Sequence, residues 1–98
     1  MAKRQRRIGL GLQEPEHALR GRNGLRMARD EYERAERGES CRTTISRLAY
    51  ARELVVSSED DLLYGDDIKN YKLASDLHQR IREDFHRALG RCLKPERK

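Results

Sequence analysis

The sequence predicts an all-α protein, a small bundle of three main helices that carries a flexible basic N-terminal arm. Apolar residues recur every three or four positions over most of the chain, which is the helical period. Residues typical of helix starts and stops divide this pattern into three segments. The 98-residue chain is 36 % hydrophobic and 40 % charged, with one Phe and no Trp. Such a composition leaves a thin core, so we expect either marginal stability of the single chain or a core shared with another chain, as in a homodimer.

Charge divides the chain into three parts, which we expect to be a basic N-terminal arm (1–13), a single helical domain (14–94) and a basic C-terminal tail (95–98). The formal net charge is +5. Residues 1–13 contribute +4 and residues 91–98 contribute +3, so residues 14–90 carry −2. A near-neutral body with basic ends indicates a polyanion or an acidic protein surface as the partner.

The first helix is expected from about Pro15 to about Arg37. Proline suits the first helical position, and Glu14 and Glu16 suit the positive end of the helix dipole. Gly38 is the expected stop. The small and apolar residues of this helix keep the alternating three-four spacing of a coiled-coil seam. They are Ala18, Gly21, Leu25, Ala28, Tyr32 and Ala35.

The second helix is expected from about Cys41 to Val56, with Ser40 as its N-cap. Its apolar positions are Ile45, Leu48, Ala49, Ala51, Val55 and Val56, and Arg52 adds its aliphatic stem. The segment from Ser57 to Asp61 then reads as a new helix start, because a serine is followed three residues later by an acid.

The third helical region is therefore expected as a short helix over 59–64 and a long one over 67–93, or as one helix kinked near Gly65. Asp66 and Asp67 supply its second start signal, and Pro95 ends it. The apolar positions of the long part again keep helical spacing. They are Tyr71, Ala74, Leu77, Ile81, Phe85, Ala88 and Cys92.

The basic ends are the first candidate site. We expect their cations to contact the phosphates of DNA or RNA. They are Lys3, Arg4, Arg6, Arg7, Arg91, Lys94, Arg97 and Lys98. Beyond the basic cluster of the arm, Ile8, Leu10 and Leu12 alternate with glycines. This alternation suggests a hook that docks on a neighbouring protein, and a disordered tail is the alternative.

The segment 38–48 resembles the turn and recognition helix of a helix-turn-helix protein. A helix ends at Gly38, a polar cap follows, and the next helix offers Arg42, Thr43, Ser46 and Arg47. The resemblance implies that Arg42 and Arg47 contact bases or backbone in a major groove. An ordinary helix start with a solvated polar first turn explains the same residues.

The other titratable groups predict no chemistry. The histidines and cysteines lack metal-ligand spacing, and no catalytic set can be argued, so we expect no cofactor, no metal and no enzymatic activity. Helix capping explains the acidic cluster Glu59, Asp60, Asp61, Asp66 and Asp67. The alternative is that this cluster receives the basic arm of a neighbouring copy. No apolar run suits a signal peptide or a membrane span, so the two cysteines are expected as free thiols in a reducing cytoplasm.

Two functions fit these features. The first is a small noncatalytic nucleic-acid-binding accessory or regulatory protein that contacts phosphates through its basic termini. The second is a structural or adaptor subunit of a larger assembly, such as a virion or ribonucleoprotein particle, whose N-terminal arm docks on a neighbouring protein. Both predict a homo-oligomer or other protein subunits as partners, and neither predicts a membrane.

Overall fold

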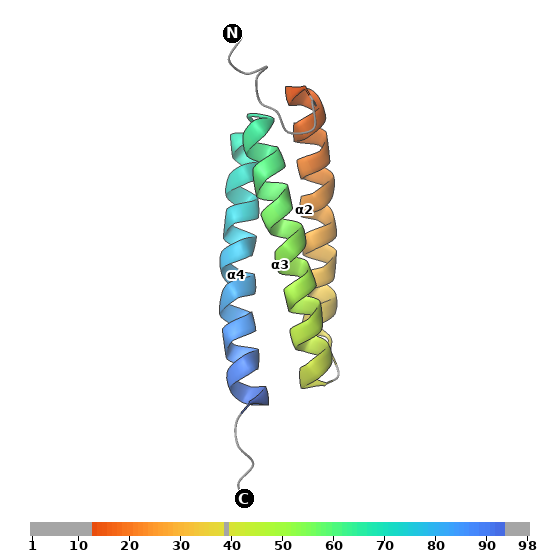
Figure 1. Ribbon diagram of the computed structural model, residues 1–98, viewed down its shortest axis with the longest axis vertical. Coiled ribbons are helices and arrows are strands. Elements are labelled where there is room, and N and C mark those ends of the chain that lie inside the picture. Colours follow the sequence, from red (N-terminus) through yellow and green to blue (C-terminus); the bar gives the residue numbers. More distant parts are fainter. Residues whose placement is uncertain (1–12, 39, 94–98) are drawn as a thin grey trace, which may run out of the picture.

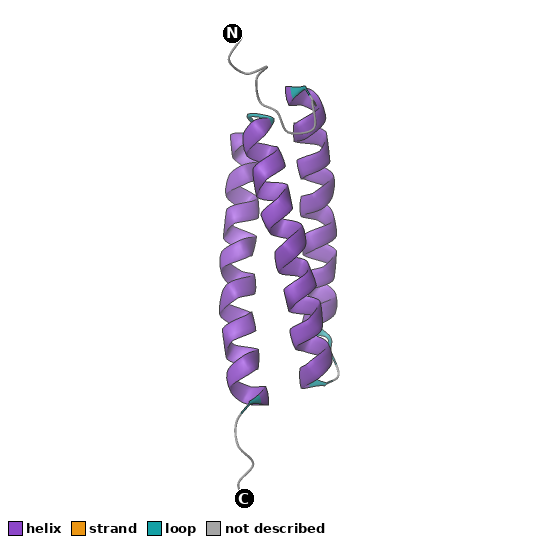
Figure 2. Ribbon diagram, viewed as in Figure 1, coloured by secondary structure: helices purple, strands orange, loops and turns teal. Residues whose placement is uncertain are grey.

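The computed structural model describes residues 13–38 and 40–93, which form three helices. They are α2 (Glu14–Glu36), α3 (Cys41–Tyr64) and α4 (Ile68–Cys92). The helices lie side by side, and each runs antiparallel to the one before it (Figure 1). A short turn of described residues joins α3 to α4, and four residues, 37–40, separate α2 from α3 in the sequence (Figure 2). The prediction of an all-α bundle of three helices is therefore confirmed.

The middle helix holds the bundle together. α3 packs along both α2 and α4, whereas α2 and α4 make few contacts with each other. Six of the thirteen buried hydrophobic residues in the described chain are alanines. Small side chains let helices approach closely but bury little area each. The core is thin, as the composition indicated, and every residue of the predicted α2 seam lies in it.

Two glycines permit the closest approaches. A Cβ on Gly21 would lie 2.6 Å from Leu62 Cγ and 2.9 Å from the Leu62 backbone nitrogen, so α2 meets α3 there with no room for a side chain. A Cβ on Gly65 would collide with the backbone of Ala18. The residue of the α3–α4 turn with positive φ is instead Asp66, at 60°. Gly65 is thus needed for space and not for backbone conformation.

The second helix is longer than predicted, and the expected helix start at Ser57 was wrong. α3 continues to Tyr64, so residues 59–64 form its last turns and not a separate helix. The cause is tertiary: the Ser58 hydroxyl is buried against α2 and donates a hydrogen bond to the Gly21 carbonyl at 2.9 Å. The chain reverses at Gly65, so the expected kink within a third helix was also wrong.

The predicted caps of the other helix starts are present. Ser40 Oγ accepts the Thr43 backbone N–H at 3.1 Å at the start of α3. At the start of α4, Asp67 Oδ1 accepts the Asn70 N–H at 3.2 Å, and Asp67 Oδ2 accepts the Asn70 side-chain amide at 2.9 Å. The side-chain bond from Asn70 is the main cause that holds the pKa of Asp67 below its usual value, and Arg22 contributes as well.

Replacing Asp67 with alanine should destabilise the protein by about 1 kcal/mol at neutral pH, because a helix cap is lost. The folded pKa of Asp67 is depressed, so its contribution is present above the unfolded value of about 4 and is lost as the pH falls through the folded pKa. Urea denaturation of both proteins between about pH 7 and pH 3 measures this difference. Asp67→Asn, which keeps a capping acceptor, should lose less at neutral pH. A difference that does not change with pH would contradict the assignment.

Gly21→Ala should destabilise the protein by about 1–3 kcal/mol, because the added methyl group overpacks the α2–α3 contact. Gly90→Ala is the matched control, since nothing lies within 4 Å of the Cβ position there. That substitution should stabilise α4 by up to about 1 kcal/mol through helix propensity alone. Chemical denaturation followed by circular dichroism compares the two. Equal effects of the same sign would refute the close packing at Gly21.

Candidate anion-binding end of the bundle

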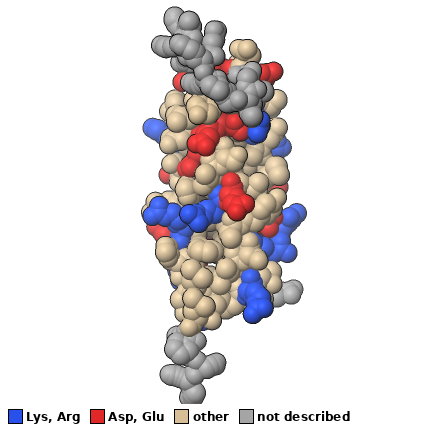
Figure 3. Space-filling model, in the orientation of Figure 1, with Lys and Arg blue, Asp and Glu red and all other residues tan. Residues whose placement is uncertain are grey.

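Basic residues lie in the first half of α3 and acidic residues in its second half, which is the reverse of the order that the helix dipole favours. Residues 40–52 contain Arg42, Arg47 and Arg52 and no acid, and residues 53–64 contain four acids and no base. A helix alone favours acids at its start and bases at its end. Figure 3 shows an acidic cluster near the end where α3 meets α4, and basic side chains further along towards the other end. We call these the turn end and the disulfide end.

Acids at the turn end are used to join helices. Asp61 Oδ1 lies 2.9 Å from His17 Nδ1, and its Oδ2 lies 3.4 Å from Arg20 Nε. Glu59 lies 3.2 Å from His78 of α4. The interpretation of all five acids as helix caps was therefore wrong, because among them the structure shows a cap at Asp67 and interhelical pairs at Glu59 and Asp61.

His17 is a buried polar residue that the sequence analysis missed. It is 4 % exposed, and its ring lies 5.3 Å from that of Tyr64. Its Nε2 is buried and has no hydrogen-bond partner in the described chain. The sequence does indicate the burial of His17, because this residue lies four positions before Gly21 and therefore on the same, buried face of the helix.

The disulfide end carries a surface pocket lined mainly by arginines. It has a volume of about 340 Å³ and is lined by Arg34, Arg37, Gly38, Thr43 and Arg47, which we call the arginine pocket. α2 supplies the first two residues in its last turn and C-cap, and α3 supplies the last two in its first two turns. The pocket therefore forms where the α2–α3 turn brings two helix ends together.

A buried carboxylate orients two of these arginines. Glu31 is 7 % exposed, and its two carboxylate oxygens each lie 3.2 Å from an Nη1 atom, one of Arg34 and one of Arg47. The Arg37 guanidinium has no ion pair within the described residues. Two guanidinium groups share the Glu31 carboxylate, and the third, of Arg37, lines the same pocket. Planar guanidinium donors held in this way suit phosphate or carboxylate groups.

A cleft lies beside the arginine pocket, between α2 and α4. It has a volume of about 560 Å³, and Gly38 lines both spaces. Tyr32 donates a hydrogen bond to Asp84 Oδ2 across the cleft at 2.6 Å. Burial, followed by the bond to Asp84 and its charge, raises the pKa of Tyr32. Arg87 and Arg91 of α4 also line the cleft together with two acids, Glu36 and Asp84, and Arg87 pairs with Asp84 at 3.1 Å.

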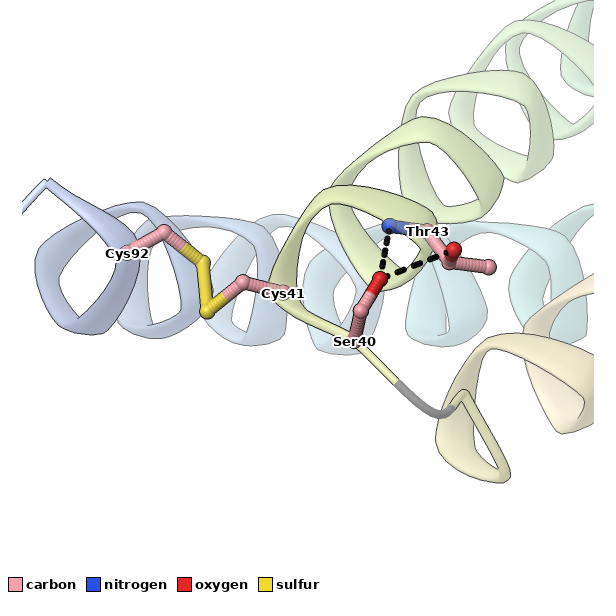
Figure 4. Close-up of a disulfide and its surroundings, with 4 residues drawn as sticks. All are labelled: Ser40, Cys41, Thr43 and Cys92. Carbon is pink, nitrogen blue, oxygen red and sulfur yellow. Dashed lines mark hydrogen bonds between the residues drawn. A yellow bond between two sulfur atoms is a disulfide. The ribbon is translucent and has the colours of Figure 1, made fainter.

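A disulfide closes this end of the bundle. Cys41 and Cys92 are bonded, with their Cα atoms 5.7 Å apart, and the expectation of free thiols was wrong (Figure 4). The reason is geometric: α3 and α4 are antiparallel and contain 24 and 25 residues, so the first residue of one meets the last residue of the other. A cross-link over 51 residues stabilises the fold by about 4 kcal/mol in the chain-entropy model.

The disulfide also brings two predicted site residues together. Arg42 follows Cys41 and Arg91 precedes Cys92, so their Cα atoms are at most about 13 Å apart. Both side chains are exposed, and Arg47 lies in the arginine pocket. The other predicted residues lie outside the described chain. They are Lys3, Arg4, Arg6, Arg7, Ile8, Leu10, Leu12, Lys94, Arg97 and Lys98.

The resemblance to a helix-turn-helix does not extend to the arrangement of the helices. Helices of that motif cross at about 90–120°. Here α2 and α3 lie side by side and antiparallel over their length, as a helical hairpin (Figure 1). Ser40 and Thr43 do form the polar first turn of α3 that the sequence suggested.

The described residues contain no group of three or more His, Cys, Asp or Glu side chains placed to hold a metal ion. Within residues 13–38 and 40–93, no helix combines the length and the apolar character of a membrane span. No protein-family model matches the chain, and comparison with curated proteins and with solved structures gives no significant match.

Proposed function

We propose that this protein is a noncatalytic nucleic-acid-binding accessory or regulatory protein, and that the disulfide end of the bundle contacts phosphates. The arginine pocket carries the proposal, because Arg34, Arg37 and Arg47 line it together and Glu31 holds two of them in place. The basic termini would add further phosphate contacts. A cytoplasmic location fits this role.

The spread of the cations favours a polymer over a small anion. Arg42 follows Cys41 at the start of α3, and Arg91 of α4 lines the neighbouring cleft. Together with the pocket arginines, these groups come from all three helices and line two separate spaces. A chain of regularly spaced phosphates can engage several of them at once, and each contact releases counterions.

The same geometry favours contacts to the backbone over reading of bases. α3 is packed along α2 and α4, so only its first turns project at the disulfide end. Arginine and threonine side chains at helix ends contact phosphates without regard to sequence. We therefore expect similar affinities for unrelated sequences of one type of nucleic acid.

Binding should depend steeply on salt and on the pocket. Fluorescence anisotropy with duplex DNA and with single-stranded RNA, between about 50 and 300 mM salt, measures the affinity and its salt slope. The triple variant R34Q/R37Q/R47Q should bind more weakly, with a slope that is smaller by about three. No binding of the full chain to either probe at low salt would refute the proposed function.

A matched control removes the same charge away from the pocket. The variant R29Q/R52Q/R82Q changes exposed arginines of all three helices that do not line the arginine pocket. It should keep most of the affinity and of the salt slope. Equal losses in both triple variants would show that net charge, and not the pocket, determines binding.

The second candidate function is a structural or adaptor subunit of a larger assembly, and exposed apolar residues at the turn end favour it. Leu19, Leu63 and Ile68 are 53 %, 51 % and 46 % exposed. They lie where α2 begins and α3 meets α4, close to the acidic cluster. Such a surface suits a neighbouring protein or a second copy of this chain, and the apolar residues of the arm, Ile8, Leu10 and Leu12, would dock on the neighbour. Light scattering of the free protein would detect a homo-oligomer.

A further inference from the structure

We propose that the Cys41–Cys92 disulfide is a redox-controlled clamp that sets the affinity of the disulfide end for nucleic acid. The inference rests on the proposed function, since it concerns the regulation of the same surface. The cytoplasm proposed above is a reducing compartment, and disulfides in such a compartment are usually transient or redox-sensing.

The disulfide is open to a reductant. Cys41 is exposed and Cys92 is partly exposed at the surface of the bundle. Neither cysteine belongs to the buried cluster that forms the core. Exposed disulfides are the reducible ones, because thiol exchange requires access to a sulfur atom. The bond therefore differs from a buried structural cross-link.

Little else holds the last turn of α4 in place. Ala88 is the last buried residue of that helix. Beyond it, Gly90 has open space around its Cβ position, and Leu93 is 71 % exposed. Leu89 in this turn is only partly buried, and α2 makes few contacts with α4. The disulfide is thus the strongest link between the end of α4 and the rest of the bundle.

The clamp holds cations from two helices on one surface. Arg91 is adjacent to Cys92 and Arg42 is adjacent to Cys41, so the bond keeps both residues at the disulfide end. Arg91 also lines the cleft that shares Gly38 with the arginine pocket. After reduction, the last turn of α4 is free to fray and to carry Arg91 away from the α3 cations.

The redox step needs a dithiol reductant and balances as ordinary thiol–disulfide exchange. A reductant thiolate attacks the more exposed Cys41 sulfur, the bond to Cys92 sulfur breaks, and a mixed disulfide forms. The second reductant thiolate then displaces Cys41. Two electrons pass to the protein, each cysteine thiolate takes up a proton, and the reductant becomes a disulfide.

The test compares the oxidised and reduced full chain in the same anisotropy titration, with thiol quantification to confirm each state. The oxidised form should bind several-fold more tightly, and its salt slope should be steeper by about one, since one phosphate contact is held in place. The double variant C41S/C92S should bind like the reduced form and should not respond to reductant.

Two single variants separate the clamp from a general effect of charge. Arg91→Gln should weaken the oxidised form to the level of the reduced wild type, with little further loss on reduction. Arg82→Gln removes the same charge from an exposed position of α4 that lines neither the cleft nor the arginine pocket. It should leave the response to reductant intact.

The outcomes are distinguishable. Equal affinity and slope in both redox states would overturn the clamp while leaving the proposed function in place. Binding by neither form would refute the proposed function and this inference with it. Circular dichroism of the reduced chain provides the remaining check: a large loss of helix on reduction would overturn the clamp, because the bond would then maintain the fold as a whole.

Discussion

The close contact between α2 and α3 is the constraint on which the rest of the structure depends. At Gly21 the absence of a side chain on α2 lets Leu62 of α3 pack directly against the α2 backbone, and the Ser58 hydroxyl donates a hydrogen bond to the Gly21 carbonyl. This contact fixes the two helices as neighbours over their full length. It thereby brings the end of α2 to the start of α3, where the arginine pocket forms, and it leaves the opposite face of α3 for α4.

Charged side chains are neutralised to different degrees at the two ends of the bundle. Acids at the turn end are satisfied within the fold, since Asp61 and Glu59 pair with histidines of other helices. At the disulfide end, two arginines share the single carboxylate of Glu31, so this group of three side chains has a net positive charge. The start of α3 therefore combines a positive helix dipole with unneutralised cations, which is unfavourable for the isolated chain and favourable once an anion binds.

Local signals predicted much of the fold, and long-range contacts account for what they missed. The α2 seam and the Ser40 cap depend on neighbouring residues and were confirmed. The start signal at Ser57 failed because burial of Ser58 against another helix outweighed it. The disulfide and the arginine pocket depend on how helices are paired, which spacing along one helix does not specify. One sign was present: Glu31 lies three residues after Ala28, on a face that is otherwise apolar.

The described residues form three antiparallel helices, so the basic segments at the two ends of the chain leave the bundle at opposite ends. α2 begins at one end of the bundle and α4 finishes at the other (Figure 1). A helix of 25 residues is about 37 Å long at 1.5 Å per residue. One straight duplex lying along the bundle would need roughly eleven base pairs, at 3.4 Å each, to reach both places where the basic segments leave the fold. Under the proposed function, the two basic ends would therefore contact two separated points on one polymer, or two different strands.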